Sequence, residues 1–306
     1  MSSGTLMILP HSDKLALQSV LDPPYKRPAH ASDGEAGALA QTLATVRAGF
    51  GGHNVLGMRI GAPDGWRPAT ELTRPGPALD ELLALATTAT ATGRADIGAT
   101  LLAEGYAWAL AMRAVGTLLY HRRIPAMAHD EVRVEHAAGD ATITGIAFAG
   151  GAFGIAGDPL EGDPSLVALD DEAALLRRLH AELHAHLEPL LETIGAASGR
   201  PQRALWRSAG DRLGGAFLWL GEVTGRRELA WDLGTRCMEG DGPLAVGSGF
   251  RVLEHAGIAE PTRDRRSCCL IWRAAGQETC FTCPLTAEAE RHRRLERRAE
   301  AVQRPA

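Results

Sequence analysis

The most distinctive stretch of this sequence is RRSCCLIWRAAGQETCFTCPL, residues 265–285. It holds four of the five cysteines of the 306-residue chain: Cys268, Cys269, Cys280 and Cys283. The first ten residues have no basic segment ahead of their short apolar run, so we expect no secretory signal peptide and a reducing compartment. Clustered thiols in such a compartment bind metal or carry out redox chemistry.

The spacing of these cysteines narrows the kind of metal centre that they can build. Cys280 and Cys283 form a Cys-x-x-Cys pair, which brings two soft thiolate ligands to one side of a turn. Cys268 and Cys269 are adjacent, and adjacent side chains point to opposite faces unless the backbone turns there. Structural zinc uses two spaced pairs, whereas a binuclear cluster offers two irons to adjacent thiolates. The pattern favours an iron–sulfur cluster, with structural zinc as the alternative.

The complete pattern, Cys-Cys, ten residues, Cys, two residues, Cys-Pro-Leu, resembles the C-terminal [2Fe-2S] signature of the FhuF family. Neighbouring residues and two body segments add to the resemblance: Trp272, Gly276, Pro284-Leu285, 94–124 and 205–209. It implies that the four cysteines hold a [2Fe-2S] cluster and that the protein, in the cytoplasm, passes one electron to Fe(III) held by an imported siderophore. The implied partners are a ferric siderophore, with the hydroxamate type as one candidate, and an external electron donor such as a ferredoxin or flavoprotein reductase.

Charged and aromatic residues surround the cysteines: Arg263, Arg265, Arg266, Arg273 and Trp272. The cluster that the resemblance implies has a formal charge of about −2, which becomes about −3 on reduction. Cations beside it would offset this charge, raise the reduction potential, or hold an anionic siderophore or partner. The alternative interpretation is an ordinary solvated basic turn.

Outward from this stretch, the body of the chain is predicted to be mostly helical. Apolar residues at steps of three and four predict a long helix over 94–124 that ends before Pro125. Further helices are predicted over 36–49 and 78–91, after Asp171, after Pro201, and, as a charged cover, within 286–303. Alternation between Val132 and Ala149 predicts a β-hairpin, and the glycine-rich run that follows predicts loops.

These patterns predict an α+β fold with two parts. The body, at 1–255, is expected to be mostly helical with a small antiparallel sheet, and the module at 256–306 to hold the four cysteines, the iron–sulfur cluster and a terminal helix. We expect the segment Gly145 to Gly157 to be a loop that receives the ferric chelate. Core burial is the preferred interpretation of Trp108, Trp206, Trp219 and Cys237, and a solvent-side pair that of His180 and His184.

Composition argues against several other classes of protein. The formal net charge of −5 disfavours nucleic-acid binding, and no uncharged stretch reaches the ~20 residues that span a bilayer. There is no GxGxxG motif and there are only two lysines, so the electron is expected to come from a separate donor. Two alternatives to a reductase remain: an iron–sulfur redox sensor, and a siderophore-binding or siderophore-synthesis protein with a structural zinc site.

Overall fold

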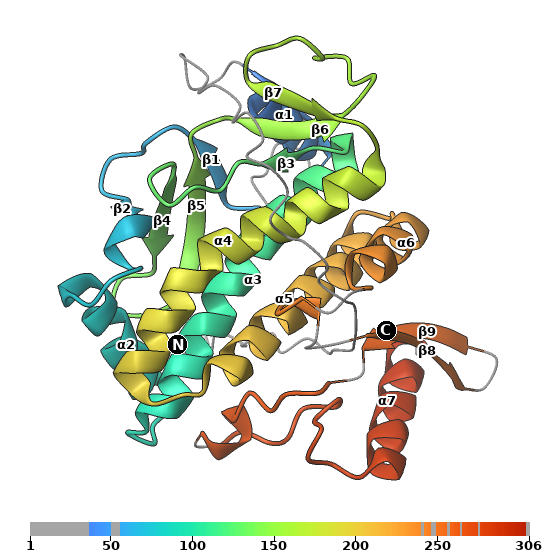
Figure 1. The fold of residues 1–306 in the computed structure, drawn as a ribbon. Helices are drawn as coiled ribbons and strands as arrows, with labels where there is room; N and C mark the ends of the chain where they lie inside the picture. The colour runs from blue at the N-terminus through green and yellow to red at the C-terminus, as the bar shows by residue number, and fades with distance from the viewer. Residues whose placement is uncertain are drawn as a thin grey trace.

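The computed structural model describes residues 37–49, 56–239, 242–245, 249–255, 258–263, 265–274 and 276–303. Its helices are α1 (Ala38–Gly49), α2 (Pro77–Ala89), α3 (Ala95–His121), α4 (Glu172–Ser198), α5 (Gln202–Val223), α6 (Arg227–Cys237) and α7 (Glu288–Gln303), with short 3-10 turns η1 (Ala69–Glu71) and η3 (Ile271–Arg273). Its strands are β1 (Met58–Ile60), β2 (Arg67–Pro68), β3 (Ile124–Pro125), β4 (Val132–His136), β5 (Ile143–Phe148), β6 (Ala152–Ile155), β7 (Leu166–Leu169), β8 (Phe250–His255) and β9 (Ile258–Arg263). Helices dominate, as predicted (Figure 1).

The long helix α3 is the centre of the body. Helices α1, α2, α4 and α5 all pack on it, so it is buried on nearly every side rather than along one stripe. It ends at Arg122, which adopts a left-handed conformation, before Pro125 is reached. Between Ile97 and Tyr120 only Glu104 and Arg113 are charged, and both are buried.

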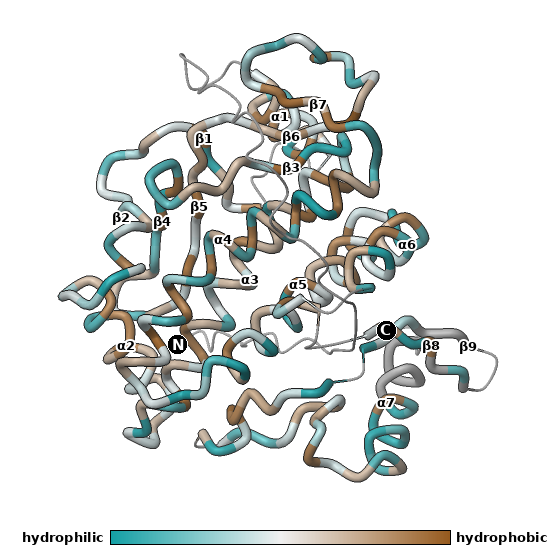
Figure 2. Tube along the Cα trace, viewed as in Figure 1, coloured by the Kyte–Doolittle hydropathy of each residue, from teal (hydrophilic) through white to brown (hydrophobic). Residues whose placement is uncertain are grey.

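The two helices that follow the sheets begin where the sequence predicts. The carboxylate of Asp171 accepts a hydrogen bond from the backbone N–H of Ala174 (2.7 Å) and caps α4, and α5 starts directly after Pro201. The predicted apolar stripes of both helices are buried in the core. By contrast α7 is largely hydrophilic (Figure 2) and carries ion pairs along its surface, such as Arg294 with Glu290.

The predicted hairpin is present as the antiparallel pair β4 and β5, but the sheets contain more than this. Strand β1 joins β5 in parallel, β2 joins β4, and a second sheet has the order β3-β6-β7 with β6 and β7 parallel. The small antiparallel sheet is therefore part of a mixed arrangement.

The prediction that Gly145 to Gly157 form a loop for the ferric chelate is wrong. Its residues supply most of β5 and all of β6, and β6 lies between two other strands. Phe153 is fully buried, and a side chain at Gly154 would press on Leu166 and Asp158. Glycine serves close packing here, so this segment offers no open loop for a chelate.

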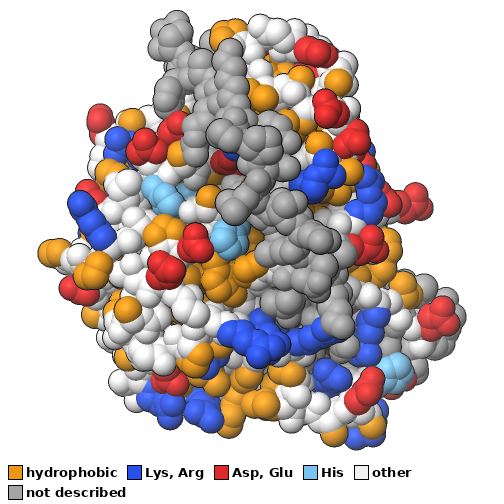
Figure 3. Space-filling view, in the orientation of Figure 1, with side chains coloured by type: hydrophobic (Ala, Val, Ile, Leu, Met, Phe, Trp, Pro, Cys, Tyr) orange, Lys and Arg blue, Asp and Glu red, His pale blue; other side chains and the backbone are white. Residues whose placement is uncertain are grey.

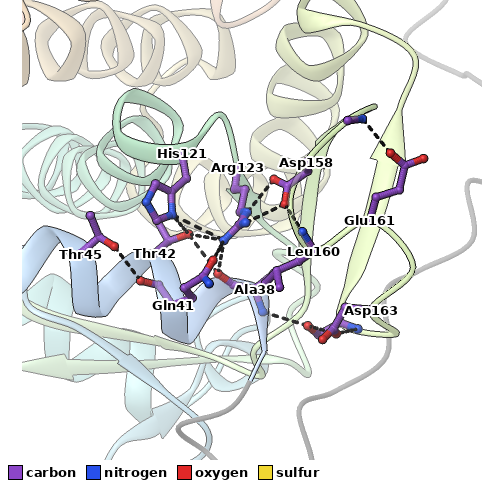
Figure 4. A network of polar contacts seen from close by, with 12 residues as sticks. Ala38, Gln41, Thr42, Thr45, His121, Arg123, Asp158, Leu160, Glu161 and Asp163 are labelled. Carbon is purple, nitrogen blue, oxygen red and sulfur yellow. Dashed lines mark hydrogen bonds and ion pairs between the residues drawn. The ribbon is translucent and has the colours of Figure 1, made fainter.

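One buried arginine fastens α1 to the body (Figure 4). Nε and Nη2 of Arg123 donate to the two carboxylate oxygens of Asp158, at 2.8 and 2.6 Å. The third nitrogen, Nη1, donates to the carbonyl of Ala38 (3.1 Å) and to the side chain of Gln41 (2.8 Å). We call these four residues the α1 clamp; it ties the start of α1 to the segment after β6.

The C-terminal elements pack against the opposite end of the body from the α1 clamp (Figure 1). Strands β8 and β9 form an antiparallel hairpin, β9 packs on α5, η3 packs on α3, and α7 packs on β8. The hairpin pairs residues on both sides of the predicted boundary at 255/256, and the two-part division itself stays a prediction. Among the described helices, none combines the length and the apolar character needed to cross a membrane.

Candidate metal centre

The four clustered cysteines lie together in two pairs. Cys269 and Cys283 are buried, and Cys268 and Cys280 are half-buried. The thiol of Cys268 interacts with that of Cys283, and the thiol of Cys269 interacts with that of Cys280. Each member of the adjacent pair thus has its partner in the Cys-x-x-Cys turn.

A backbone turn directly after the adjacent cysteines makes this arrangement possible. Leu270 has φ +61°, a left-handed conformation that a leucine rarely adopts, and its N–H donates to the sulfur of Cys268 (3.4 Å). The turn that the adjacent cysteines require is therefore confirmed.

The two adjacent thiols, Cys268 and Cys269, differ in acidity. The interaction with Cys283 lowers the pKa of Cys268 to about 6 against the effect of burial, and the Leu270 N–H adds to the lowering. The interaction with Cys280 and burial together raise the pKa of Cys269 well above its ordinary value, although Arg265 opposes this. Cys269 would have to lose its proton to act as a ligand.

The donor set, four thiols in two pairs, fits a binuclear cluster. Two separate thiol pairs match two irons. The buried donors Thr282 Oγ1 and Arg265 Nε also have no hydrogen-bond partner among the described residues, and such donors suit cluster sulfurs.

The arginines predicted beside the cysteines fall into two classes. Arg263 and Arg265 are about 1% and 2% exposed, so the interpretation as a solvated basic turn is wrong for them. Arg266 and Arg273 are exposed, and the guanidinium of Arg273 lies 5.2 Å from the ring centre of half-buried Trp272. Figure 3 shows Lys and Arg side chains gathered over the lower part of this face, around an orange patch at the C-terminal module.

Arg265 connects the cysteines to the body. Its Nη1 lies 3.6 Å from the sulfur of Cys280, and its Nη2 lies 2.9 Å from Glu104 of α3 and 3.5 Å from Asp211 of α5. Burial opposes its charge, but Asp211 and Glu104 raise the pKa of Arg265 above its ordinary value. The residue is therefore a permanent cation beside Cys280.

Two further arginines complete a buried group that we call the cysteine-side network: Glu104, Asp211, Arg212, Arg263 and Arg265. Arg212 pairs with Glu104, and Arg263 donates to the backbone carbonyl of Asp211. Gly215 leaves room for Arg263, because a Cβ at that position would clash with its Nη1. Three arginines against two carboxylates give this network a formal surplus of one positive charge.

The body side of the site was missed by the sequence analysis. Glu104 and Asp211 are fully buried in helices, and a lone carboxylate within an apolar helix was the signal that could have revealed Glu104. Arg200, between α4 and α5, was missed as well; it donates to the backbone carbonyl of Cys268 (3.0 Å). Cys237 is a buried thiol on α6, as predicted.

The aromatic and histidine residues of the body take structural positions. Trp108, Trp206 and Trp219 are half-buried against the core. His180 bonds to the backbone carbonyl of Cys237 and His184 stacks on Trp206 at 4.8 Å, so both are partly buried rather than on the solvent side.

Two family models match this chain. One, described as ferric iron reductase FhuF-like transporter, matches residues 102–248, and the other, described as FhuF 2Fe-2S C-terminal domain, matches residues 265–285. The chain belongs to the FhuF-like ferric iron reductase family. Together the two matches cover more than half of the chain, and the second spans all four clustered cysteines. The cofactor of this family member is a [2Fe-2S] cluster, and its activity is that of an iron reductase. A comparison with curated proteins found no match to the chain.

Proposed function

We propose that this FhuF-like protein is a cytoplasmic ferric-siderophore reductase whose cluster is held by Cys268, Cys269, Cys280 and Cys283. The main support is that these cysteines lie in two interacting pairs within the segment that matches the 2Fe-2S domain. Under this proposal, Cys268 and Cys283 bind one iron, and Cys269 and Cys280 bind the other. When bound, the cluster supplies reversible one-electron chemistry.

Ligand preference explains why one electron suffices. Siderophore oxygens hold the hard ferric ion more strongly than the ferrous ion, so reduction weakens the complex and frees the metal without breaking the chelator. The chain accepts one electron from an external donor and passes one electron to Fe(III). The proposed donor is a ferredoxin or a flavoprotein reductase, since the sequence has no nucleotide-binding GxGxxG motif.

We assign roles to the five residues predicted beside the cysteines according to how deeply each side chain is buried. Arg263 and Arg265 are too deeply buried to touch a substrate, so we assign them to charge compensation. Arg266, Arg273 and the half-buried Trp272 are the proposed contacts for an anionic ferric chelate, because they lie at the accessible side of the module. Hydroxamate siderophores are one candidate class of substrate.

The test starts with anaerobically purified full-length protein. We expect two irons and two acid-labile sulfides per chain, and an electron paramagnetic resonance signal after dithionite reduction and removal of the dithionite. Mixing with a ferric trihydroxamate or a ferric tricatecholate, with a ferrous chelator as trap, should release one Fe(II) per reduced chain. The chelate that reacts faster identifies the substrate class.

Two outcomes would contradict the proposal. Stoichiometric zinc without sulfide would leave a structural metal site. A loaded protein that reduces neither chelate, yet binds a protein or nucleic acid only in one redox state, would instead be a sensor.

A further inference from the structure

The cysteine-side network contains a carboxylate, Glu104, that is linked to Cys280 through a single side chain, Arg265. Glu104 lies on α3 of the body and is fully buried. Its Oε1 accepts from Nη2 of Arg265 at 2.9 Å, while Nη1 of the same guanidinium lies 3.6 Å from the sulfur of Cys280. One planar group therefore joins a body carboxylate to a cysteine.

The guanidinium is rigid, so the position of one end fixes the position of the other. With Nη2 held between Glu104 and Asp211, Nη1 stays directed at Cys280. The exposed fraction of about 2% leaves Arg265 no solvated alternative position. Glu104 is itself fixed by a second cation, Arg212 of α5.

Glu104 also acts through its charge. Burial opposes its ionisation, but Arg212 and Arg265 outweigh this effect and hold the pKa of Glu104 below its ordinary value. It is therefore an anion at neutral pH, and it offsets part of the positive charge that Arg265 presents to Cys280. A reduced cluster has one more negative charge than an oxidised one, so any uncompensated cation nearby favours reduction.

The geometry points to Glu104 as a positioning residue for electron transfer: it orients Arg265 against Cys280 and sets how much of that cation's charge the cluster experiences. This inference rests on the proposed role of Cys280 as a ligand. Reduction adds one electron to the cluster from the external donor, and no bond of Glu104 or Arg265 is formed or broken in that step.

The experiment is a redox titration of the full-length protein followed by electron paramagnetic resonance. Glu104→Gln keeps the shape and one acceptor oxygen but removes the negative charge, so the reduction equilibrium should shift about tenfold toward the reduced form, ~59 mV more positive for one electron. Arg265→Gln removes the cation and should shift the equilibrium at least as far in the opposite direction. Arg265→Lys should fall between wild type and Arg265→Gln, because it keeps the charge and loses the two-ended contact.

Asp158→Asn is the matched control. It also removes one carboxylate charge from a buried arginine pair, but it does so in the α1 clamp, at the other end of the body (Figure 1). Its reduction potential should equal that of the wild type. If Glu104→Gln fails to fold, the two Arg265 variants still test the same contact, because both should shift the potential in the negative direction and Arg265→Gln should shift it further than Arg265→Lys.

An unchanged potential in fully loaded Glu104→Gln, or a shift no larger than that of Asp158→Asn, would overturn the inference. So would a potential of Arg265→Gln equal to that of the wild type. Failure of the proposed function looks different, because the wild-type protein itself would then lack iron, sulfide and a reducible signal.

Discussion

The α1 clamp and the cysteine-side network are built from the same kinds of residue and differ in how completely they are satisfied. In the clamp all three guanidinium nitrogens of Arg123 have acceptors, and Asp158 is paired at both oxygens. In the network, Nε of Arg265 and both Nε and Nη2 of Arg263 have no hydrogen-bond partner among the described residues. Unsatisfied buried donors are costly in stability. The polar groups of the clamp satisfy one another, whereas the network leaves these buried donors free within the described part of the chain; under the proposed function, cluster sulfurs would be acceptors for Arg265, which already contacts Cys280.

Removal of one proposed ligand is the strongest way to test this contrast. Cys283→Ala deletes a buried thiol, so we expect loss of iron, acid-labile sulfide and visible absorption. Because the network then lacks its acceptors, amide hydrogen exchange should increase in β9 and in residues 265–274. Exchange in α1 should not change, since the clamp is complete without the cluster. Hydrogen exchange followed by mass spectrometry measures both regions in one sample.

Cys237→Ala is the control for that variant. Cys237 is buried to a similar extent, at 3% exposed against 2% for Cys283, but it lies on α6 and belongs to neither cysteine pair. It should keep the full iron and sulfide content. Equal cluster loss in the two variants would show that a buried thiol, rather than a ligand, is what the module needs.

Opening the clamp should give the next largest effect. Asp158→Ala leaves Arg123 buried without its carboxylate, which typically costs about 3–5 kcal/mol of unfolding free energy. Urea unfolding measures this loss, and hydrogen exchange should locate it in α1. The cluster content and its spectrum should match the wild type. A change in the reduction potential would contradict the separation of the two regions.

The same contrast explains what the sequence could and could not predict. Helices α3, α4 and α5 and the β4–β5 hairpin repeat their apolar residues over many positions, so local pattern was sufficient to predict them. Strand β6 has only four residues, two of them alanine and glycine, which is too short for its alternation to stand out from a glycine-rich loop.

The cysteine segment was predictable because its four proposed ligands lie within sixteen residues of each other, from Cys268 to Cys283. The network was not, because Glu104 and Arg265 are 161 residues apart and meet only through the packing of the module on α3 and α5. Arginine is usually exposed, so nothing in the local sequence marked Arg263 and Arg265 as buried.

Two adjacent glycines of α5 offer a smaller test on the network side. Gly215→Ala places a methyl group against the guanidinium of Arg263, which is buried and cannot move into solvent. We expect a loss of about 1–3 kcal/mol in unfolding free energy from overpacking, and a changed electron paramagnetic resonance spectrum. At Gly214 the nearest atom would be 3.7 Å away, so Gly214→Ala should be neutral or gain up to about 1 kcal/mol from helix propensity. Equal effects of the two changes would contradict the close contact with Arg263.

The smallest expected effect concerns His186, a side chain of the body whose two ring nitrogens both have polar partners, as the nitrogens of Arg123 do in the α1 clamp. His186 is buried; its Nδ1 donates to the carbonyl of Met127 (2.6 Å), and its Nε2 lies 2.8 Å from the hydroxyl of Tyr106, which donates to it when the ring is neutral. Burial, and then the neighbouring His129, lower the pKa of His186 to about 3 from 6.5.

Between pH 6.5 and about 3 the unfolded chain therefore binds a proton that the folded protein does not, so stability present above pH 6.5 is lost as the pH falls through this window. The loss from this residue is at most about 1.4 kcal/mol per pH unit. Urea unfolding at pH 7.5, 6.5 and 5.5 should show a smaller decline for His186→Gln than for the wild type. Equal slopes in the two proteins would mean that His186 accepts a proton in the folded state.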